Sequence, residues 1–258
     1  MGEKNTSRKL LTTSVLLALL ALVSVTAATA AWMTIADRTR VRSMRMEITT
    51  GASLRFDLDP HETFEEYIKT LTFDQIADRI QAEKQFDPRT VPLTPVTTTD
   101  CIAFTIEDGS EAKTEYYLEF TLHFMSTQDM IVHLTTADSD AGEDGTLVSS
   151  ETAGVPEALR ISFSAEETSI YDPGMGGGAQ WGNAYKTFGL PAGDSVTYSD
   201  DNALFSLTAY ENKPVILRLW LEGTDEACTD AIRKAEYSIR LRFVGTDENG
   251  NLLEGKPN

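Results

Sequence analysis

The stretch VILRLWLEGTDEACTDAIRKAEYSIRLRF, from Val215 to Phe243, decides the fold class of this chain. Apolar and polar residues alternate in its first part, Val215–Glu222, and again in its last part, Glu236–Phe243. Successive side chains of a strand point to opposite faces, so each part predicts a strand with one buried face. The connector Gly223–Ala235 is too long for a tight hairpin, and its Thr-Asp-Glu start predicts one or two helical turns. We therefore expect two long strands of a one-faced antiparallel sheet, joined by a short helical crossover.

Similar alternation recurs along the chain and predicts about nine or ten strands. Met44–Leu58 alternates on both sides of Thr50-Gly51, which predicts a hairpin. Glu115–Phe124 is the clearest strand, and one register with the following strand, Met130–Leu134, sets His123 opposite His133. Two strand histidines without a nearby third ligand predict no metal site. Many short strands separated by turns indicate a mainly β protein, an antiparallel β-sandwich of jelly-roll type.

Residues 60–86 are predicted to form a two-helix insertion in this sandwich. Asp59 and Pro60 suit the start of a first helix, with Phe64, Tyr67, Ile68 and Leu71 on one face. Thr72 and Gln75 form a capping box for a second helix. The apolar stripe of the second helix is Phe73, Ile76, Ala77 and Ile80. Asp87-Pro88 ends the insertion.

The N-terminus has the pattern of an export signal. Basic residues precede an uncharged run, and Ala28-Thr29-Ala30 supplies a small-x-small cleavage pattern before Ala31. This predicts a signal peptide over residues 1–30 and a single β-sandwich domain over 31–258. The alternative is an uncleaved N-terminal membrane anchor, because the uncharged run is long enough to span a bilayer. Either way we expect a secreted or cell-surface protein that contacts a membrane only through an uncleaved leader.

Composition and motifs argue against several classes of function. The net charge is −18, which repels nucleic-acid phosphate and anionic lipid. His61-Glu62 is not followed by the second histidine of a zinc protease, and no Gly-x-Ser-x-Gly motif occurs. The acidic run Asp138–Gly145 lacks EF-hand spacing, and Gly174–Gly178 lacks the lysine of a phosphate loop. We therefore expect no catalytic residue, no metal and no cofactor.

The chain has two cysteines, Cys101 and Cys228. An even number in an exported protein permits a disulfide between them. Two isolated thiols are the alternative.

Several quoted patches resemble one group of Gram-positive surface proteins. These patches are LWLEGTDEACTDAI (Leu219–Ile232), TAATAAWMTIAD (Thr26–Asp37), LTPVTTTD (Leu93–Asp100) and ALRISFS with SIYDPG (within Ala158–Gly174). The chain resembles the TasA/camelysin family, biofilm-matrix fibre proteins whose leaders are cut by a SipW-type signal peptidase. The resemblance implies a jelly-roll sandwich and self-association. Camelysin is classed as a metalloprotease, but that activity is not carried over, because the zinc signature is absent here.

The leading expectation is a non-catalytic, self-associating biofilm-matrix or fibre subunit, whose partners are further copies or other matrix proteins. The resemblance implies that the N-terminal segment of one subunit completes the sheet of the next. The candidate donor strand is Trp32, Met33, Thr34 and Ile35. The alternative is a carbohydrate-binding or adhesive module that uses Trp181, Tyr185 and Tyr198. A hydrolase on the same scaffold is the third possibility.

Overall fold

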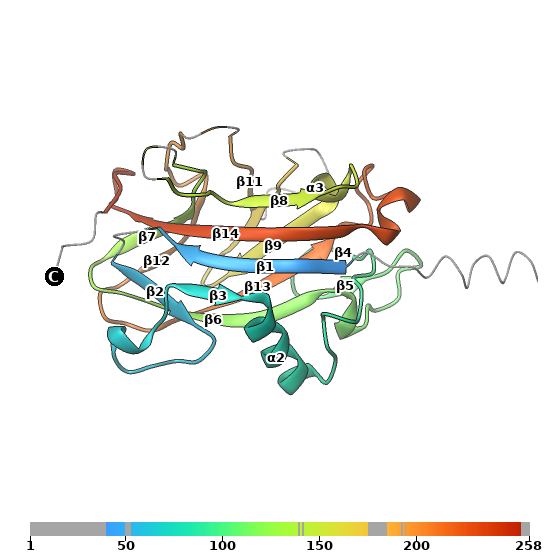
Figure 1. The fold of residues 1–258 in the computed structure, drawn as a ribbon, viewed down its shortest axis with the longest axis horizontal. Helices are drawn as coiled ribbons and strands as arrows, with labels where there is room; N and C mark the ends of the chain where they lie inside the picture. Colours follow the sequence, from blue (N-terminus) through green and yellow to red (C-terminus); the bar gives the residue numbers. More distant parts are fainter. Residues whose placement is uncertain are drawn as a thin grey trace, which may run out of the picture. The chain divides into compact units, whose positions relative to one another are not determined.

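Two six-stranded β-sheets pack against each other in a computed structural model of the protein (Figure 1). The structure describes residues 40–49, 53–138, 140, 142–174, 185–191, 193 and 195–253. All of them belong to one structural unit, Thr39–Asn258. The prediction of a mainly β, sandwich-like fold is therefore confirmed.

The first sheet has the strand order β12-β7-β14-β1-β3, and β8 also pairs with β14. Its strands are β1 (Arg40–Ile48), β3 (Thr70–Thr72), β7 (Met130–Leu134), β8 (Leu147–Ser150), β12 (Ala203–Leu207) and β14 (Glu236–Thr246). The long strands β1 and β14 lie side by side at its centre and run parallel (Figure 1).

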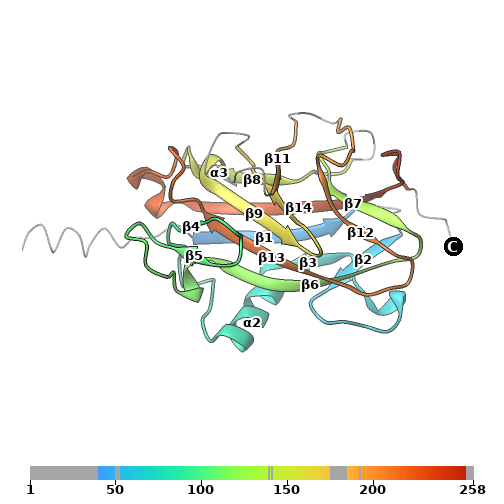
Figure 2. The same cartoon turned by 180° about the vertical axis from the view of Figure 1, so that it is seen from behind.

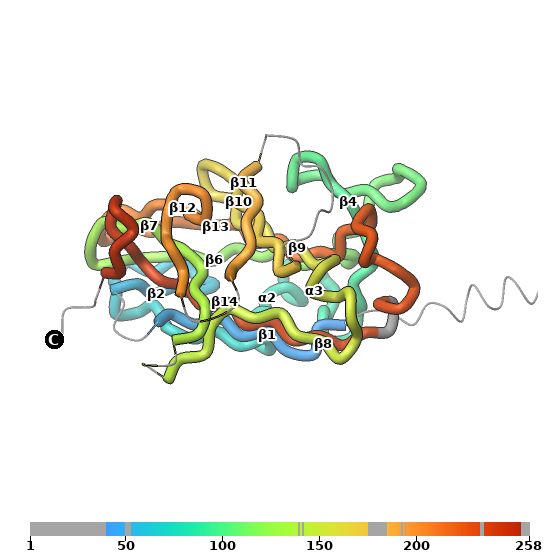
Figure 3. Tube along the Cα trace, turned by 90° about the horizontal axis from the view of Figure 1, so that it is seen from above, coloured from blue at the N-terminus to red at the C-terminus, as the bar shows by residue number. Residues whose placement is uncertain are grey.

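The second sheet has the order β11-β10-β9-β13-β6-β2. Its strands are β2 (Leu54–Asp57), β6 (Leu118–Ser126), β9 (Leu159–Ser164), β10 (Thr168–Tyr171), β11 (Lys186–Phe188) and β13 (Lys213–Leu221). Figure 2 shows this sheet in front, with β9, β13 and β6 next to one another. Viewed from above, β1 and β8 lie on one side of the sandwich and β10 and β11 on the other (Figure 3).

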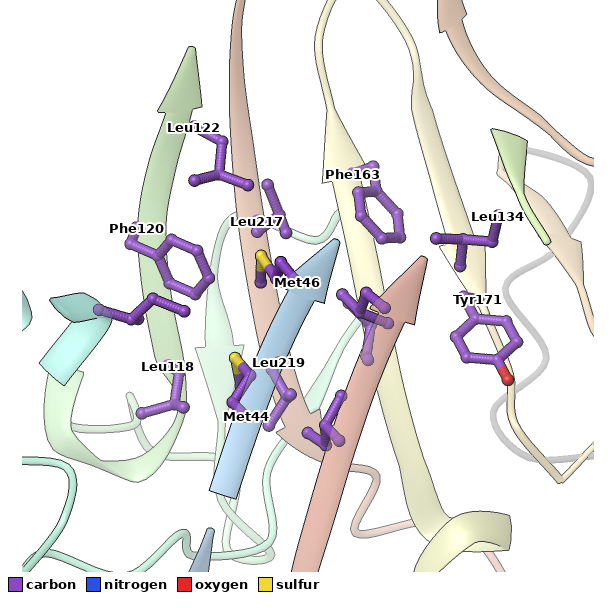
Figure 4. Packing of buried hydrophobic residues seen from close by; sticks show 14 of the residues in the cluster. Met44, Met46, Leu118, Phe120, Leu122, Leu134, Phe163, Tyr171, Leu217 and Leu219 are labelled. Atoms are coloured by element: carbon purple, nitrogen blue, oxygen red, sulfur yellow. The ribbon is translucent and has the colours of Figure 1, made fainter. Parts of the chain in front are cut away.

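The core fills the space between the two sheets with the inward residues that alternation predicts. In Figure 4, Met44 and Met46 of β1 face Leu217 and Leu219 of β13. Phe243 of β14 is fully buried in the core and packs against aromatic rings of the other sheet. Its ring lies 5.8 Å from Phe56, 5.4 Å from Phe124 and 6.0 Å from Phe163, measured between ring centroids. These rings come from three strands of the opposite sheet, so they join the two layers directly.

Three predicted strand pairings are wrong, because consecutive strands enter different sheets. β13 and β14 do not share a sheet, and the crossover that joins them contains a 3₁₀-helix at Asp230–Lys234. β1 pairs with β14 and β3, while β2 pairs with β6, so Met44–Leu58 is no hairpin. β6 and β7 are likewise separated. Neither sheet is purely antiparallel, because β1 is parallel to β14 and β10 is parallel to β11.

The insertion contains one of the two predicted helices. α2 (Phe73–Lys84) has the predicted capping box, in which Thr72 N donates to Gln75 Oε1 at 3.0 Å. Its buried residues are the predicted stripe, Phe73, Ile76, Ala77 and Ile80. α2 contacts β6 of the second sheet and β1 and β3 of the first. The first predicted helix is wrong: the chain forms a 3₁₀ turn at Phe64–Glu66 and then strand β3, paired with β1. A short helix, α3 (Val155–Ala158), precedes β9.

A second, smaller apolar cluster covers part of the outer face of β13. It contains Val96, Cys101, Phe104, Tyr117, Ile170 and Trp220. The Phe104 ring stacks on Tyr117 at 4.2 Å and meets Trp220 edge-on at 5.3 Å, between ring centroids. The connector that carries β4 (Thr97–Thr98) and β5 (Phe104–Thr105) supplies half of this cluster. Trp220, which alternation places on the face of β13 opposite the main core, is therefore buried as well.

Candidate functional site

Part of β1 has no neighbouring strand on one side. β14 pairs with β1 from Arg40 to Ile48, whereas β3 pairs with it only from Arg45 to Glu47. α2 begins directly after β3 and contacts β1, and no strand of the described chain continues along Arg40–Met44 on that side. Backbone N–H and C=O groups at such an edge can pair with an added strand. We call Arg40–Met44 the open edge of β1.

The open edge is strongly basic. Arg40, Arg42 and Arg45 are all exposed, and Arg45 forms an ion pair with Glu47. Within the described ranges no acidic side chain forms an ion pair with Arg40 or Arg42. Four arginines fall within the eight residues Arg38–Arg45 of a chain whose net charge is −18. This cluster of arginines is visible in the sequence, but the alternation of apolar and polar residues does not indicate a function for it.

Two further arginines of the first sheet are engaged by the acidic turn at Asp138–Gly145. Arg242 contacts Glu143 at 2.8 Å and Glu47 at 3.1 Å, and Arg240 contacts Asp144 at 3.1 Å, between nitrogen and carboxylate oxygen. Ion pairing to β14 therefore accounts for two of the acidic residues of this turn, Glu143 and Asp144. In the described part of the chain, no group of three or more histidine, cysteine or acidic residues is arranged to hold a metal ion.

A buried ion-pair cluster stabilises the junction between β9 and the crossover after β13. The guanidinium of Arg160 is fully buried, and its Nη2 lies 2.6 Å from Asp225 Oδ2 and 3.3 Å from Asp172 Oδ2. Arg160 Nη1 also donates to the backbone oxygens of Glu157 and Leu159. Because both carboxylates are nearly as buried, this cluster fixes structure and offers no access to a substrate.

An open hollow of about 440 Å³ lies beside the first residues of β13. Its lining comes from the turn between β9 and β10 and from the connection between β12 and β13: Ala165, Glu166, Thr208, Glu211, Asn212, Lys213 and Pro214. Lys213 Nζ contacts Glu166 Oε1 at 2.6 Å across it. The hollow thus has donors and acceptors beside apolar surface from Ala165 and Pro214.

Asn212, one of the lining residues, is held in place by residues behind it. The Tyr67 hydroxyl lies 3.0 Å from Asn212 Oδ1 and 3.2 Å from the backbone oxygen of His61, and His123 Nδ1 lies 3.1 Å from the same Asn212 oxygen. Burial raises the pKa of Tyr67, so the phenol remains a donor. His61 packs edge-on against Tyr67, and its Nε2 lies 3.1 Å from Asp57 Oδ2. Sequence patterns gave no signal for this group, because its members lie as much as 145 positions apart.

The predicted pairing of His123 with His133 does not occur. His123 is on β6 of the second sheet and contacts Asn212. His133 is on β7 of the first sheet, is buried, and bonds to Asn202 and Thr246. Burial lowers the pKa of His133, so its neutral form is favoured. The two histidines therefore have separate structural environments.

The aromatic residues considered for sugar stacking do not form one exposed surface among the described residues. The Tyr185 hydroxyl donates to the backbone oxygen of Asp100 at 3.1 Å, and the ring packs against the second cluster. The Tyr198 hydroxyl is 2.6 Å from Thr135 Oγ1, and its ring lies 5.1 Å from His133, between centroids. Trp181 lies outside the described residues.

The remaining predicted site residues have mixed outcomes. Ala28, Ala30 and Ala31 at the cleavage pattern, and the donor segment Trp32–Ile35, lie outside the described residues. Cys101 and Cys228 are both thiols in this structure. They belong to different apolar surroundings, because Cys101 is part of the second cluster whereas Cys228 packs against the main core. Among the described helices, none has the length and apolarity needed to cross a membrane.

Comparison with protein-family models, curated proteins and solved structures gives no match for this chain.

Proposed function

We propose that the chain is an exported, non-catalytic β-sandwich subunit that self-associates into fibres at the surface of a Gram-positive cell. The observation that carries this proposal is the open edge of β1, Arg40–Met44, which has one strand neighbour where the rest of β1 has two. Strand addition at such an edge supplies main-chain hydrogen bonds without any catalytic group. The resemblance to TasA-like proteins supports the same conclusion.

The donor of the added strand is the segment Trp32–Ile35 of a neighbouring copy. It precedes β1 by only a few residues, and an extended chain rises about 3.3 Å per residue, so Ile35 can reach about 16 Å and Trp32 about 26 Å from Arg40. A tight hairpin back onto its own β1 favours residues with positive φ, and Asp37–Thr39 contains no glycine. Addition to a second copy avoids that requirement. The contact is head-to-tail, and such a contact generates an open filament when its rotation does not close into a ring.

The distribution of charge also supports strand addition at the open edge of β1. Cleavage before Ala31 removes three basic residues and one acidic residue from a chain of net charge −18, so the cleaved subunit has a net charge of −20, and two copies repel each other overall. The exposed arginines of the open edge provide a local positive surface, and this surface offsets the repulsion where a second acidic copy docks. Cleavage before Ala31 frees the donor segment, so export and assembly are coupled.

The test compares protein that starts at Ala31 with protein that starts at Arg38, by light scattering and electron microscopy under the same conditions. We expect fibres only from the longer form, because only that form keeps the donor segment. Equal polymerisation of both forms, or of neither, contradicts the proposal.

A charge-matched pair of variants tests the open edge itself. Arg40→Glu with Arg42→Glu should slow fibre growth, whereas Lys69→Glu with Lys113→Glu changes the net charge equally at exposed positions outside Arg40–Met44. If both double variants slow growth to the same extent, total charge controls assembly and the open edge is not the contact.

A further inference from the structure

The hollow at the start of β13 is a second surface with its own chemistry, separate from the open edge of β1. We propose that it binds a neutral, hydroxyl-rich glycan, with Asn212, Lys213 and Glu166 contacting sugar hydroxyls and Tyr210 contacting a sugar ring. Its volume of about 440 Å³ lies in the range of small-ligand sites, roughly 300–1,000 Å³.

The orientation of Asn212 is the first observation. Its Oδ1 is occupied by two contacts, at 3.0 Å to the Tyr67 hydroxyl and 3.1 Å to His123 Nδ1. No described residue accepts a hydrogen bond from Asn212 Nδ2. The Tyr67 hydroxyl has a single proton and also lies 3.2 Å from the backbone oxygen of His61, so the orientation of the amide rests on His123. With His123 Nδ1 as the donor, Asn212 turns its oxygen to the residues behind the hollow and leaves its NH₂ group as a donor for a ligand.

Tyr210 is the second observation. It is 65% exposed, one of four large apolar or aromatic side chains with such exposure in the described chain. Tyr210 is not one of the residues that line the hollow, but it directly precedes the lining residue Glu211 in the chain, and its backbone has φ of +60°. A bulky residue rarely adopts this conformation, and such strain persists where surrounding contacts enforce it.

Those surrounding contacts are present in the same loop. Tyr210 N donates to the Ser126 backbone oxygen at 2.7 Å, and Ala209 N donates to Asp129 Oδ1 at 2.9 Å. Glu211 N donates to the Thr208 oxygen at 3.2 Å. The loop is therefore preorganised to present an aromatic ring to solvent, which lowers the entropic cost of binding.

The donors and acceptors that line the hollow favour a neutral sugar as the ligand. Glu166 and Glu211 are acceptors, Lys213 and Asn212 are donors, and the Thr208 hydroxyl is both. Sugar hydroxyls also donate and accept, so they match such a surface, and exposed aromatic rings pack on the apolar faces of sugars. Two carboxylates against one ammonium leave the lining negative, which disfavours phosphorylated, sulfated or uronic-acid ligands.

The experiment is titration calorimetry of the exported protein with maltotriose, laminaritriose, cellotriose and triacetylchitotriose. We expect at least one to bind saturably, with Kd of about 0.1–1 mM, as is typical of a few hydrogen bonds on an open surface. Absence of saturable binding for all four up to about 10 mM overturns the proposal.

Isosteric variants locate the site. Asn212→Asp keeps the oxygen that Tyr67 and His123 contact but removes the NH₂ donor, so affinity should fall about tenfold while the melting temperature is retained. Tyr210→Asn tolerates positive φ but lacks the ring, and it should also weaken binding. Ile102→Ala removes a comparably exposed apolar side chain elsewhere and should leave affinity unchanged. Wild-type affinity in Asn212→Asp, or an equal loss in Ile102→Ala, overturns the proposal.

Discussion

Replacing Ile76 by alanine should lower the free energy of unfolding by about 2–5 kcal/mol. Ile76 is fully buried on the face of α2 that contacts β6, β1 and β3, so it packs against both sheets. The substitution removes three carbon atoms from the core. At about 0.8 kcal/mol for each buried methylene, the transfer contribution alone is about 2.4 kcal/mol. A residual cavity raises the cost further, because α2 is held at its N-terminus by a capping box and cannot collapse freely.

Phe64→Ala is the matched comparison, because this ring belonged to the predicted helix that does not form. Phe64 is only partly buried in a 3₁₀ turn, and its ring contacts the Arg55 guanidinium at 4.5 Å from the centroid. Its loss should cost about 1 kcal/mol.

Urea unfolding followed by circular dichroism measures both variants. With an m-value of about 2–3 kcal/mol/M, Ile76→Ala should lower the midpoint by about 1 M or more without changing m. A loss below about 0.5 kcal/mol in Ile76→Ala would mean that α2 does not pack between the sheets. If Phe64→Ala lowers the free energy of unfolding as much as Ile76→Ala or more, Ile76 is not the more deeply packed of the two side chains, and the reasoning is refuted.

Three further outcomes are expected. Burial lowers the pKa of His133 from 6.5, so below about pH 6.5 the unfolded chain binds more protons than the folded chain and stability should fall. The melting temperature of the wild type should therefore decrease between pH 8 and 5, and this decrease should be smaller in His133→Gln. An unchanged slope in the variant would contradict this. Burial raises the pKa of the Cys101 thiol to about 12, so Cys101 should react with iodoacetamide much more slowly than Cys228 in the native protein. Mass spectrometry measures the labelling of each cysteine, and equal labelling would count against the burial of Cys101. Arg160→Met removes the cation that contacts Asp225 and should cost about 3–5 kcal/mol in urea unfolding, whereas a neutral or stabilising effect would show that the cluster is dispensable.

Alternation in the sequence predicted which side chains are buried but not which strands pair. Met44 and Met46 of β1 and Phe56 of β2 are all inward, as predicted, yet they enter the core from opposite sheets. Two sheets that pack on one another share a single apolar layer, so an inward side chain has the same pattern in either sheet. Sheet membership is decided by long-range pairing, which no local pattern records.

Local sequence patterns predicted the structure correctly where it depends on contacts between residues close in sequence. The capping box of Thr72 and Gln75 and the apolar stripe of α2 are satisfied within a few residues, and both are confirmed. The spacing from Phe64 to Leu71 also fits a helix, but Thr70–Thr72 pairs with β1, so tertiary context overrides the local preference there. Trp220, a large apolar side chain on the outer face of β13, was a local sign that a second cluster covers that face.

The candidate site was less predictable than the fold. The arginines of the open edge are adjacent in sequence, yet their position at an unpaired edge follows from β3 ending at Thr72. The group behind the hollow joins residues that are remote in sequence, Tyr67 and His123 with Asn212. A site assembled from distant segments has no motif, so only the folded chain brings it together.

The parallel pairing of β1 with β14 has a consequence for how the protein acquires its fold during synthesis. The first and last described strands lie side by side at the centre of one sheet, shown in blue and red in Figure 1, with Arg40 opposite Glu236 in register. A chain that emerges N-terminus first cannot complete this sheet until its final strand has been delivered. Such high contact order slows folding and keeps the nascent chain loosely structured for the whole of its translation. Removing the last strand would therefore deprive β1 of its full-length partner, so truncation at the C-terminus would prevent folding of the whole domain and not only of its end.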